Sequence, residues 1–180
     1  SIAHVDGMRE RTIIVNGVSK AYAMTGWRIG FIAAPEWIVK GCNKLQGQYT
    51  SGPCSVSQKA AEAAYTTSQE CVETMRKAVE RRRDLIVELA SQIPGLEVNK
   101  PEGAFYLFPK CSSFFGKSYN GKTINNSTDL AMFLLEVGHV ATVGGDAFGD
   151  PYCFRMSYAT SDDNIREALK RIKDTLALLS

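Results

Sequence analysis

Apolar and polar residues alternate along this chain with two different periods. Two apolar runs, Thr12–Val15 and Arg28–Ala34, are rich in Ile, Val and Phe, and we expect them to form β-strands joined by an irregular loop. Apolar residues at helical spacing then predict three helices, which begin near Pro35, Gln58 and Gln69. This first part of the chain therefore has the pattern of an α/β structure.

From Leu96 onward, short strands and helices follow one another in the pattern of an α+β domain. Four strands are expected, over Leu96–Val98, Ala104–Phe108, Val140–Val143 and Cys153–Ala159. Two helices are expected as well, one from about Ser127 to Val137 and one after Ser161. Ser57, Ser127 and Ser161 each precede an apolar periodic run, so we expect their side chains to cap the helices that follow.

The composition is that of an ordinary globular chain of 180 residues, with 44% hydrophobic and 22% charged residues. A formal net charge of +2 argues against a nucleic-acid partner, because nucleic-acid-binding domains concentrate Lys and Arg far more strongly. No stretch approaches the length of a membrane span. The five cysteines are scattered and form no C-x-x-C pair, which argues against a disulfide framework or a zinc site and favours the reducing cytoplasm.

The loop between the first two strands carries one lysine, Lys20, and Arg28 opens the second strand. A lysine held among buried strands tends towards its neutral, nucleophilic amine, because burial penalises the ammonium form. A nearby guanidinium favours the same neutral amine and can also hold a phosphate through paired hydrogen bonds. An amine beside a phosphate-binding arginine indicates an aldehyde cofactor that carries a phosphate. We therefore expect pyridoxal 5′-phosphate.

The run GVSKAYAMTGWRIG, from Gly17 to Gly30, resembles the cofactor-lysine signature of class I aminotransferases of the aspartate aminotransferase group. In that family, the lysine at the position of Lys20 carries the cofactor covalently, and the arginine at the position of Arg28 binds its phosphate. One departure is that many relatives have a second phosphate-binding serine where Gly17 stands. We expect either Ser19 or a backbone N–H to take its place.

The resemblance extends to two residues outside that run. Ser51 lies in a polar loop that, in this family, approaches the active site of the other subunit, and a hydroxyl at its position often reaches the cofactor phosphate. Arg155 lies in mid-strand, where alternation separates it from Phe154 and Met156 on the opposite face. Its planar fork suits a carboxylate. In the similar family, the arginine of this motif grips the α-carboxylate of the amino-acid substrate.

The resemblance implies a fold-type I pyridoxal-phosphate enzyme, of which this chain supplies only the C-terminal half. Residues 1–67 would be the C-terminal part of the large α/β cofactor-binding domain, 68–94 the connecting long helix, and 95–180 the small C-terminal α+β domain. The implied reaction transfers the α-amino group of an amino acid, with aspartate expected, to a 2-oxo acid, with 2-oxoglutarate expected. However, Gly47 stands where aspartate-specific relatives place an arginine that reads the side-chain carboxylate, so these residues leave the donor open.

The resemblance also implies a homodimer, and it places the partner of the pyridine nitrogen and the glycine-rich phosphate turn outside this chain. We therefore expect the chain alone to be an inactive fragment. Two alternatives stay open. One is another fold-type I enzyme, a lyase or a decarboxylating transferase, that uses Lys20, Arg28 and Arg155. The other is a structural or interaction module without catalysis.

The segment Gly116–Thr123 fits the letters of a nucleotide phosphate-binding loop, G-x-x-x-x-G-K-[ST]. Such a loop works only between a buried strand and a helix whose N-terminus faces the phosphates. Here the preceding residues make a poor strand end, and three residues separate Thr123 from the next helix. We therefore expect a surface loop.

Overall fold

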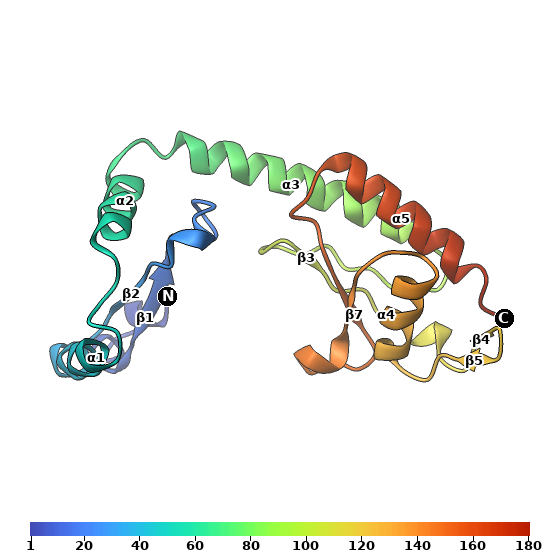
Figure 1. Ribbon diagram of the computed structural model, residues 1–180, viewed down its shortest axis with the longest axis horizontal. Coiled ribbons are helices and arrows are strands. Elements are labelled where there is room, and N and C mark those ends of the chain that lie inside the picture. The colour runs from blue at the N-terminus through green and yellow to red at the C-terminus, as the bar shows by residue number, and fades with distance from the viewer. The chain divides into compact units, whose positions relative to one another are not determined.

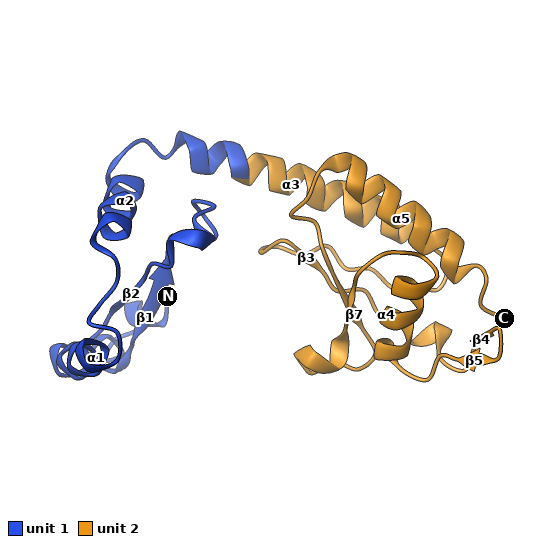
Figure 2. Cartoon of the chain, in the orientation of Figure 1, with its two compact units in different colours: residues 1–75 blue, residues 76–180 orange.

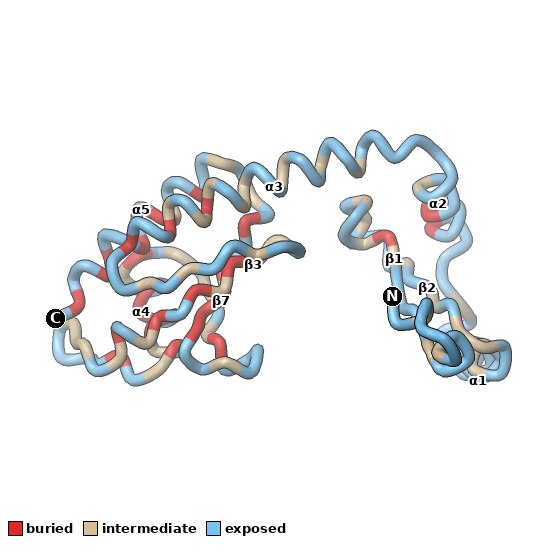
Figure 3. The backbone as a smooth tube through the Cα atoms, turned by 180° about the vertical axis from the view of Figure 1, so that it is seen from behind, coloured by how far each residue is buried: buried red, intermediate tan, exposed pale blue.

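The structure is a computed structural model that describes residues 1–180 as two compact units, Ser1–Met75 and Arg76–Ser180 (Figures 1 and 2). Most of the buried residues belong to the second unit (Figure 3). The division falls within α3 (Glu70–Ser91), which begins in the first unit and ends in the second. The expected three-part division of the chain stays a prediction. None of the helices combines the length and the apolar character needed to cross a bilayer.

The first unit is organised around an antiparallel pair of strands, β1 (Ile14–Gly17) and β2 (Gly30–Ala33). Gly17 pairs with Gly30, so the loop that leaves β1 returns directly to the start of β2. β1 is as long as expected but begins and ends two residues later, whereas β2 is shorter than expected; neither strand contains a buried residue. Their apolar side chains are therefore open to solvent in this chain.

Short turns precede this strand pair and helices follow it. They are η1 (Ile2–His4), η2 (Arg9–Arg11), α1 (Glu36–Tyr49) and α2 (Ser55–Thr66). The predicted helix after Pro35 is confirmed. The cap of α2 differs from the expectation, because Cys54 is the N-cap residue and Ser57 lies buried inside the first turn. The helix begins earlier than its apolar pattern shows, since a polar first turn carries no periodic signal.

The second unit contains a three-stranded antiparallel sheet in the order β3 (Tyr106–Leu107), β7 (Phe154–Ser157), β6 (Val143–Gly144). One face of this sheet joins α3, α4 (Ser127–Glu136) and α5 (Asp162–Leu176) in a single hydrophobic core. Its fully buried members include Ala90, Leu107, Leu130, Leu134, Phe154 and Ile172. The strand expected at Leu96–Val98 is reduced to one isolated bridge, between Glu97 and Lys110.

Two of the three helices in this core, α4 and α5, begin with side-chain caps. Ser161 caps α5 as expected, since its hydroxyl accepts a hydrogen bond from the amide of Asn164. The cap of α4 is Asn126 rather than Ser127, and its side chain accepts from the amide of Asp129 at 2.8 Å. Ser127 is instead fully buried. The apolar stripe of α5 is buried throughout, as its periodicity predicted; it consists of Ile165, Leu169, Ile172 and Leu176.

The segment that imitates a phosphate-binding loop is a β-hairpin. β4 (Ser118–Tyr119) pairs with β5 (Lys122–Thr123), and Asn120 and Gly121 form the turn with φ of 48° and 80°. Positive φ at both central positions is what a two-residue hairpin turn requires, and Asn-Gly is a preferred pair for it. The rejection of a nucleotide-binding loop is confirmed, because the glycine serves the hairpin turn.

Candidate active site

Lys20 lies in the loop between β1 and β2. The loop turns tightly there, because the amide of Tyr22 donates to the carbonyl of Val18 at 3.3 Å and the amide of Ala23 donates to the carbonyl of Lys20 at 3.2 Å. Val18 is fully buried and anchors the loop, whereas Lys20 is exposed. This chain therefore does not provide the burial on which the expectation of a neutral amine rested.

The loop closes where the backbones of the two strands meet. A Cβ atom added at Gly17 would lie 2.8 Å from the carbonyl oxygen of Ile29, closer than real Cβ atoms come. The residue three before Lys20 is therefore held to glycine by the close approach of the strands.

Arg28 is not the first residue of the second strand. It ends the 3₁₀ turn η3 (Thr25–Trp27) in the left-handed conformation, with φ 53° and ψ 50°. One guanidinium nitrogen, Nη1, donates to the carbonyl oxygen of Thr25 at 3.0 Å. A non-glycine residue in this region stores conformational energy, and such residues gather at functional sites. The exposed Arg28 and Lys20 thus project from one closed loop.

Aromatic contacts fasten this loop to the helix behind it. The ring of Tyr65 on α2 lies edge-on to Tyr22 at 5.1 Å and to Phe31 at 5.6 Å between centroids. The hydroxyl of Tyr22 donates to the side-chain oxygen of Gln69 at 2.7 Å. The amide nitrogen of Gln69 donates in turn to the carbonyls of Ala64 and Thr67, which fixes the orientation of its side chain. The lysine loop is therefore tied to the start of α3.

The two predicted serines lie in different places. Ser19 is half-buried beside Lys20. Ser51 is exposed in the connection between α1 and α2 and has a positive φ of 60°. Ala23, Arg28 and Ser51 are the three non-glycine residues of the first unit with a positive φ. All the residues expected to hold the cofactor thus belong to the first unit.

Arg155 lies in the second unit, on the central strand β7. Its neighbours Phe154 and Met156 are buried in the core, which confirms the alternation expected from the sequence. The half-buried guanidinium of Arg155 lies on the other face of the sheet, over the rings of Tyr106 and Phe148. An arginine held there can present its planar donors to an anion.

The sequence as a whole matches a known family. The model of the family described as aminotransferase class I and II matches residues 2–172. The chain belongs to this family. A bifunctional aspartate aminotransferase and glutamate/aspartate-prephenate aminotransferase of Petunia hybrida is 48% identical over 99% of this chain and 38% of its own length. An aspartate aminotransferase of Rhizobium meliloti (strain 1021) is also 48% identical, over 92% of this chain and 41% of its own length.

Solved aminotransferase structures agree with the sequence comparison. The crystal structure of the aspartate aminotransferase from Rhizobium meliloti matches with a TM-score of 0.94 at 46% identity, over 98% of this chain and 44% of that one. An aromatic aminotransferase from Pyrococcus horikoshii matches with a TM-score of 0.89 at 40% identity, over 98% of this chain and 46% of that one. The fold is that of the fold-type I aminotransferases, as expected. The chain spans about two fifths of the length of the curated relatives it matches.

Aminotransferases of this family use pyridoxal phosphate, and the donor set of the first unit fits that cofactor. A primary amine reacts with the aldehyde, and a guanidinium binds the phosphate. Lys20 and Arg28 supply these two groups from one loop that the strand pair closes. The serine hydroxyls expected to assist are on the same unit.

The sequence alone did not reveal the residues that support the candidate site residues. The contact of Tyr22 with Gln69 joins residues 47 positions apart, and the rings near Arg155 come from separate elements. The sequence shows that these segments contain aromatic residues, but no local pattern predicts which rings contact one another. Such contacts depend on the register of the sheet and on the packing of helices.

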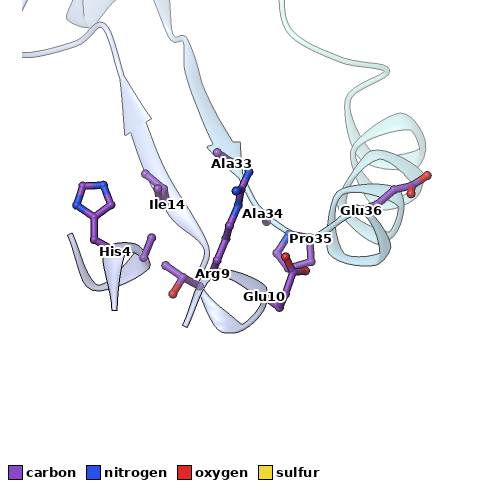
Figure 4. A pocket seen from close by; sticks show the side chains of 10 residues that line it. His4, Arg9, Glu10, Ile14, Ala33, Ala34, Pro35 and Glu36 are labelled. Carbon is purple, nitrogen blue, oxygen red and sulfur yellow. The ribbon is translucent and has the colours of Figure 1, made fainter. Parts of the chain in front are cut away.

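A hollow in the first unit is lined by residues other than those predicted to bind the cofactor. Its volume is about 630 Å³. Its lining residues come from η1, η2, the adjoining ends of β1 and β2, and the segment that leads into α1 (Figure 4). Its charged lining residues are of mixed sign: Arg9, Glu10 and Glu36. None of the predicted site residues contributes to it, and its charges favour no single ligand class.

The thiols of the chain are all free and differ in environment. Burial raises the pKa of Cys111 to about 12, and burial also raises the pKa of Cys153 to about 11. The amides of Ser57 and Val56, at the start of α2, lower the pKa of Cys54 by hydrogen bonding. The buried thiols are therefore inert, whereas Cys54 is the reactive one of the three.

Proposed function

We propose that the protein is a pyridoxal-phosphate-dependent aminotransferase that transfers the α-amino group of aspartate to 2-oxoglutarate. The observation that carries this proposal is the pair Lys20 and Arg28 on one closed loop, in a chain of the aminotransferase family. The names of the relatives support aspartate as the donor. The names of several relatives add prephenate, so oxo acids of that type belong in the acceptor panel.

Each site residue has a distinct role in this proposal. Lys20 would hold the cofactor through its amine, and the same amine would take a proton from the substrate α-carbon and return it. Bound pyridoxal phosphate supplies the electron sink that makes this carbon acidic. Arg28 holds the phosphate, with Ser19 and Ser51 as further donors. Arg155 binds the substrate α-carboxylate and so orients the bond to be broken.

The proposal extends to the organisation of the protein. Residues 1–67 would belong to the large cofactor-binding domain, 68–94 to the connecting helix and 95–180 to the small domain. The protein would act as a cytoplasmic homodimer. Size measurement by light scattering and fractionation of cells that produce it test these two statements, and a monomer or a membrane-bound pool would contradict them.

Trapping the cofactor tests the role of Lys20. The chain is titrated with pyridoxal phosphate, borohydride fixes the lysine–cofactor bond, and peptide mapping locates it. We expect the adduct on Lys20 and a weaker yield in Arg28→Ala, because the phosphate loses its cation. Lys40 and Lys44, both exposed on α1, are internal controls. Adducts spread over these controls, with Lys20 spared, would contradict the assignment of Lys20.

Turnover distinguishes an aminotransferase from the alternatives. We expect the 180-residue chain alone to be inactive, since the resemblance places the partner of the pyridine nitrogen outside it. The protein as its gene encodes it should convert aspartate and 2-oxoglutarate into oxaloacetate and glutamate, and Lys20→Ala should abolish this. Loss of the amino acid as a decarboxylated product or as ammonia would indicate a decarboxylase or lyase instead.

A further inference from the structure

Aromatic rings, rather than an acid, surround the charge of Arg155. Its guanidinium carbon lies 4.4 Å from the ring centroid of Tyr106 and 4.3 Å from that of Phe148. The negative face of an aromatic ring attracts a cation placed over it. The two rings therefore take the place that a carboxylate often has beside a buried arginine.

The two rings reach Arg155 from β3 and from the turn that follows β6. β7 is the central strand, with β3 on one side and β6 on the other. Tyr106 lies on β3 opposite Ser157, and alternation puts Arg155, two residues before Ser157, on the same face. Phe148 ends η5 (Gly145–Phe148), the turn that directly follows β6. The rings thus flank the guanidinium.

The turn that carries Phe148 is held tightly although Phe148 itself is 45% exposed. Its ring lies edge-on to Phe108, with centroids 6.0 Å apart. At the other end of the turn, the amide of Gly145 donates to the buried hydroxyl of Ser127 at 3.0 Å. Phe148 is therefore fixed by its own contacts and can order the arginine that it covers.

We propose that Tyr106 and Phe148 form an aromatic slot that holds Arg155 edge-on, and that Phe148 is a positioning residue for the substrate carboxylate. This inference rests on the proposed role of Arg155. Rings over the faces of a guanidinium leave its in-plane N–H groups as the approach for an anion. A carboxylate that meets them in that plane forms paired hydrogen bonds. Because the rings carry no negative charge, the slot orders Arg155 without competing with the substrate.

Kinetics of the protein as its gene encodes it test the slot. We expect Phe148→Leu to raise the KM for aspartate by about threefold to thirtyfold, the range of a partly desolvated cation–π contact, with kcat changed by less than about twofold. Phe148→Tyr keeps the ring and should restore KM. Tyr152→Leu is the matched control, because Tyr152 is an exposed ring stacked on Phe115 and covers no guanidinium.

Nitrogen NMR of the arginine side chains in the 180-residue chain gives a readout without turnover. In the wild type, the slot should slow rotation about the Nε–Cζ bond of Arg155 and give it a dispersed signal. In Phe148→Leu this signal should broaden or move to the position of exposed arginines. Succinate, used as the probe carboxylate, should shift the Arg155 signal at lower concentration in the wild type than in Phe148→Leu.

The outcomes separate the inference from the proposed function. If Arg155→Lys raises KM but Phe148→Leu does not, the slot is refuted while the role of Arg155 stands. If Arg155→Lys leaves KM unchanged, the proposed role of Arg155 fails, and the slot fails with it. A defect in Phe148→Leu that Phe148→Tyr does not repair also overturns the inference, because the aromatic ring would then be irrelevant.

Discussion

Replacing Gly145 by alanine tests whether close backbone packing fixes the turn that carries Phe148. A Cβ atom at this position would lie 2.0 Å from the carbonyl oxygen of Asp150 and 2.3 Å from that of Cys153. Both atoms belong to the backbone, so no side-chain rotation relieves the clash. The turn must move, and the amide of Gly145 then leaves the hydroxyl of Ser127.

The magnitude follows from these two effects. Overpacking of a tight site costs about 1–3 kcal/mol, and an unsatisfied buried hydroxyl costs about 1–3 kcal/mol more. Gly145→Ala should therefore lower the free energy of unfolding of the second unit by roughly 2–6 kcal/mol. Gly103→Ala is the matched control, because a Cβ atom there meets nothing within 4 Å.

Urea unfolding monitored by far-UV circular dichroism measures the change, since most of the helical core lies in the second unit. Both tryptophans, Trp27 and Trp37, lie in the first unit, so their fluorescence should not follow this transition. A loss within about 0.5 kcal/mol of that in Gly103→Ala would refute the packing argument, because this is the usual range of neutral surface changes.

Three further predictions concern charge, thiols and a helix cap. Hydrogen bonds from Arg81 hold the pKa of the Asp162 carboxyl below its usual value, so the contribution of this carboxyl to stability is present above about pH 4 and is lost as the pH falls through the lowered pKa. Asp162→Asn should remove this part of the acid dependence of stability, as measured by urea unfolding at a series of pH values. An unchanged dependence on pH would contradict the prediction. Iodoacetamide at about pH 7.5 should label Cys54 and spare Cys111, because the pKa of Cys54 is lowered and that of Cys111 is raised to about 12. Mass spectrometry of the peptides locates the label, and early labelling of Cys111 would refute the prediction. Asn126→Ala should cost about 1 kcal/mol in urea unfolding through loss of the α4 cap, and an unchanged midpoint would show that Asn126 is not the cap.

Local sequence patterns predict the presence of helices and strands in the second unit better than the residues at which these elements begin and end. The apolar stripe of α5 and the alternation around Arg155 are properties of one segment, so the sequence displays them directly. The predicted cap of α4, Ser127, is one residue after the observed cap, Asn126. Both residue types are good helix caps, and only packing decides between them. Ser127 lost that role because its hydroxyl serves the amide of Gly145, 18 positions away.

Lys20 and Arg28 could be found from the sequence because both belong to one continuous motif, Gly17–Gly30. Their environment could not be found in that way. The strands that flank them are expected from their apolar runs to be buried, yet neither contains a buried residue. The left-handed conformation of Arg28 depends on how η3 meets β2, which no residue preference indicates.

The pair β1 and β2 has a consequence for handling the chain in solution. A two-stranded sheet has an outer edge on each strand, and here the edges belong to segments with exposed apolar side chains such as Val15, at 76%, and Phe31, at 44%. Such an edge is a template on which another copy can add a strand. The isolated chain should therefore self-associate through the very hairpin that carries Lys20, and dilution or a charged substitution at Val15 should keep it dispersed. The apparent affinity from a cofactor titration of the chain would therefore also depend on how far the chain has self-associated.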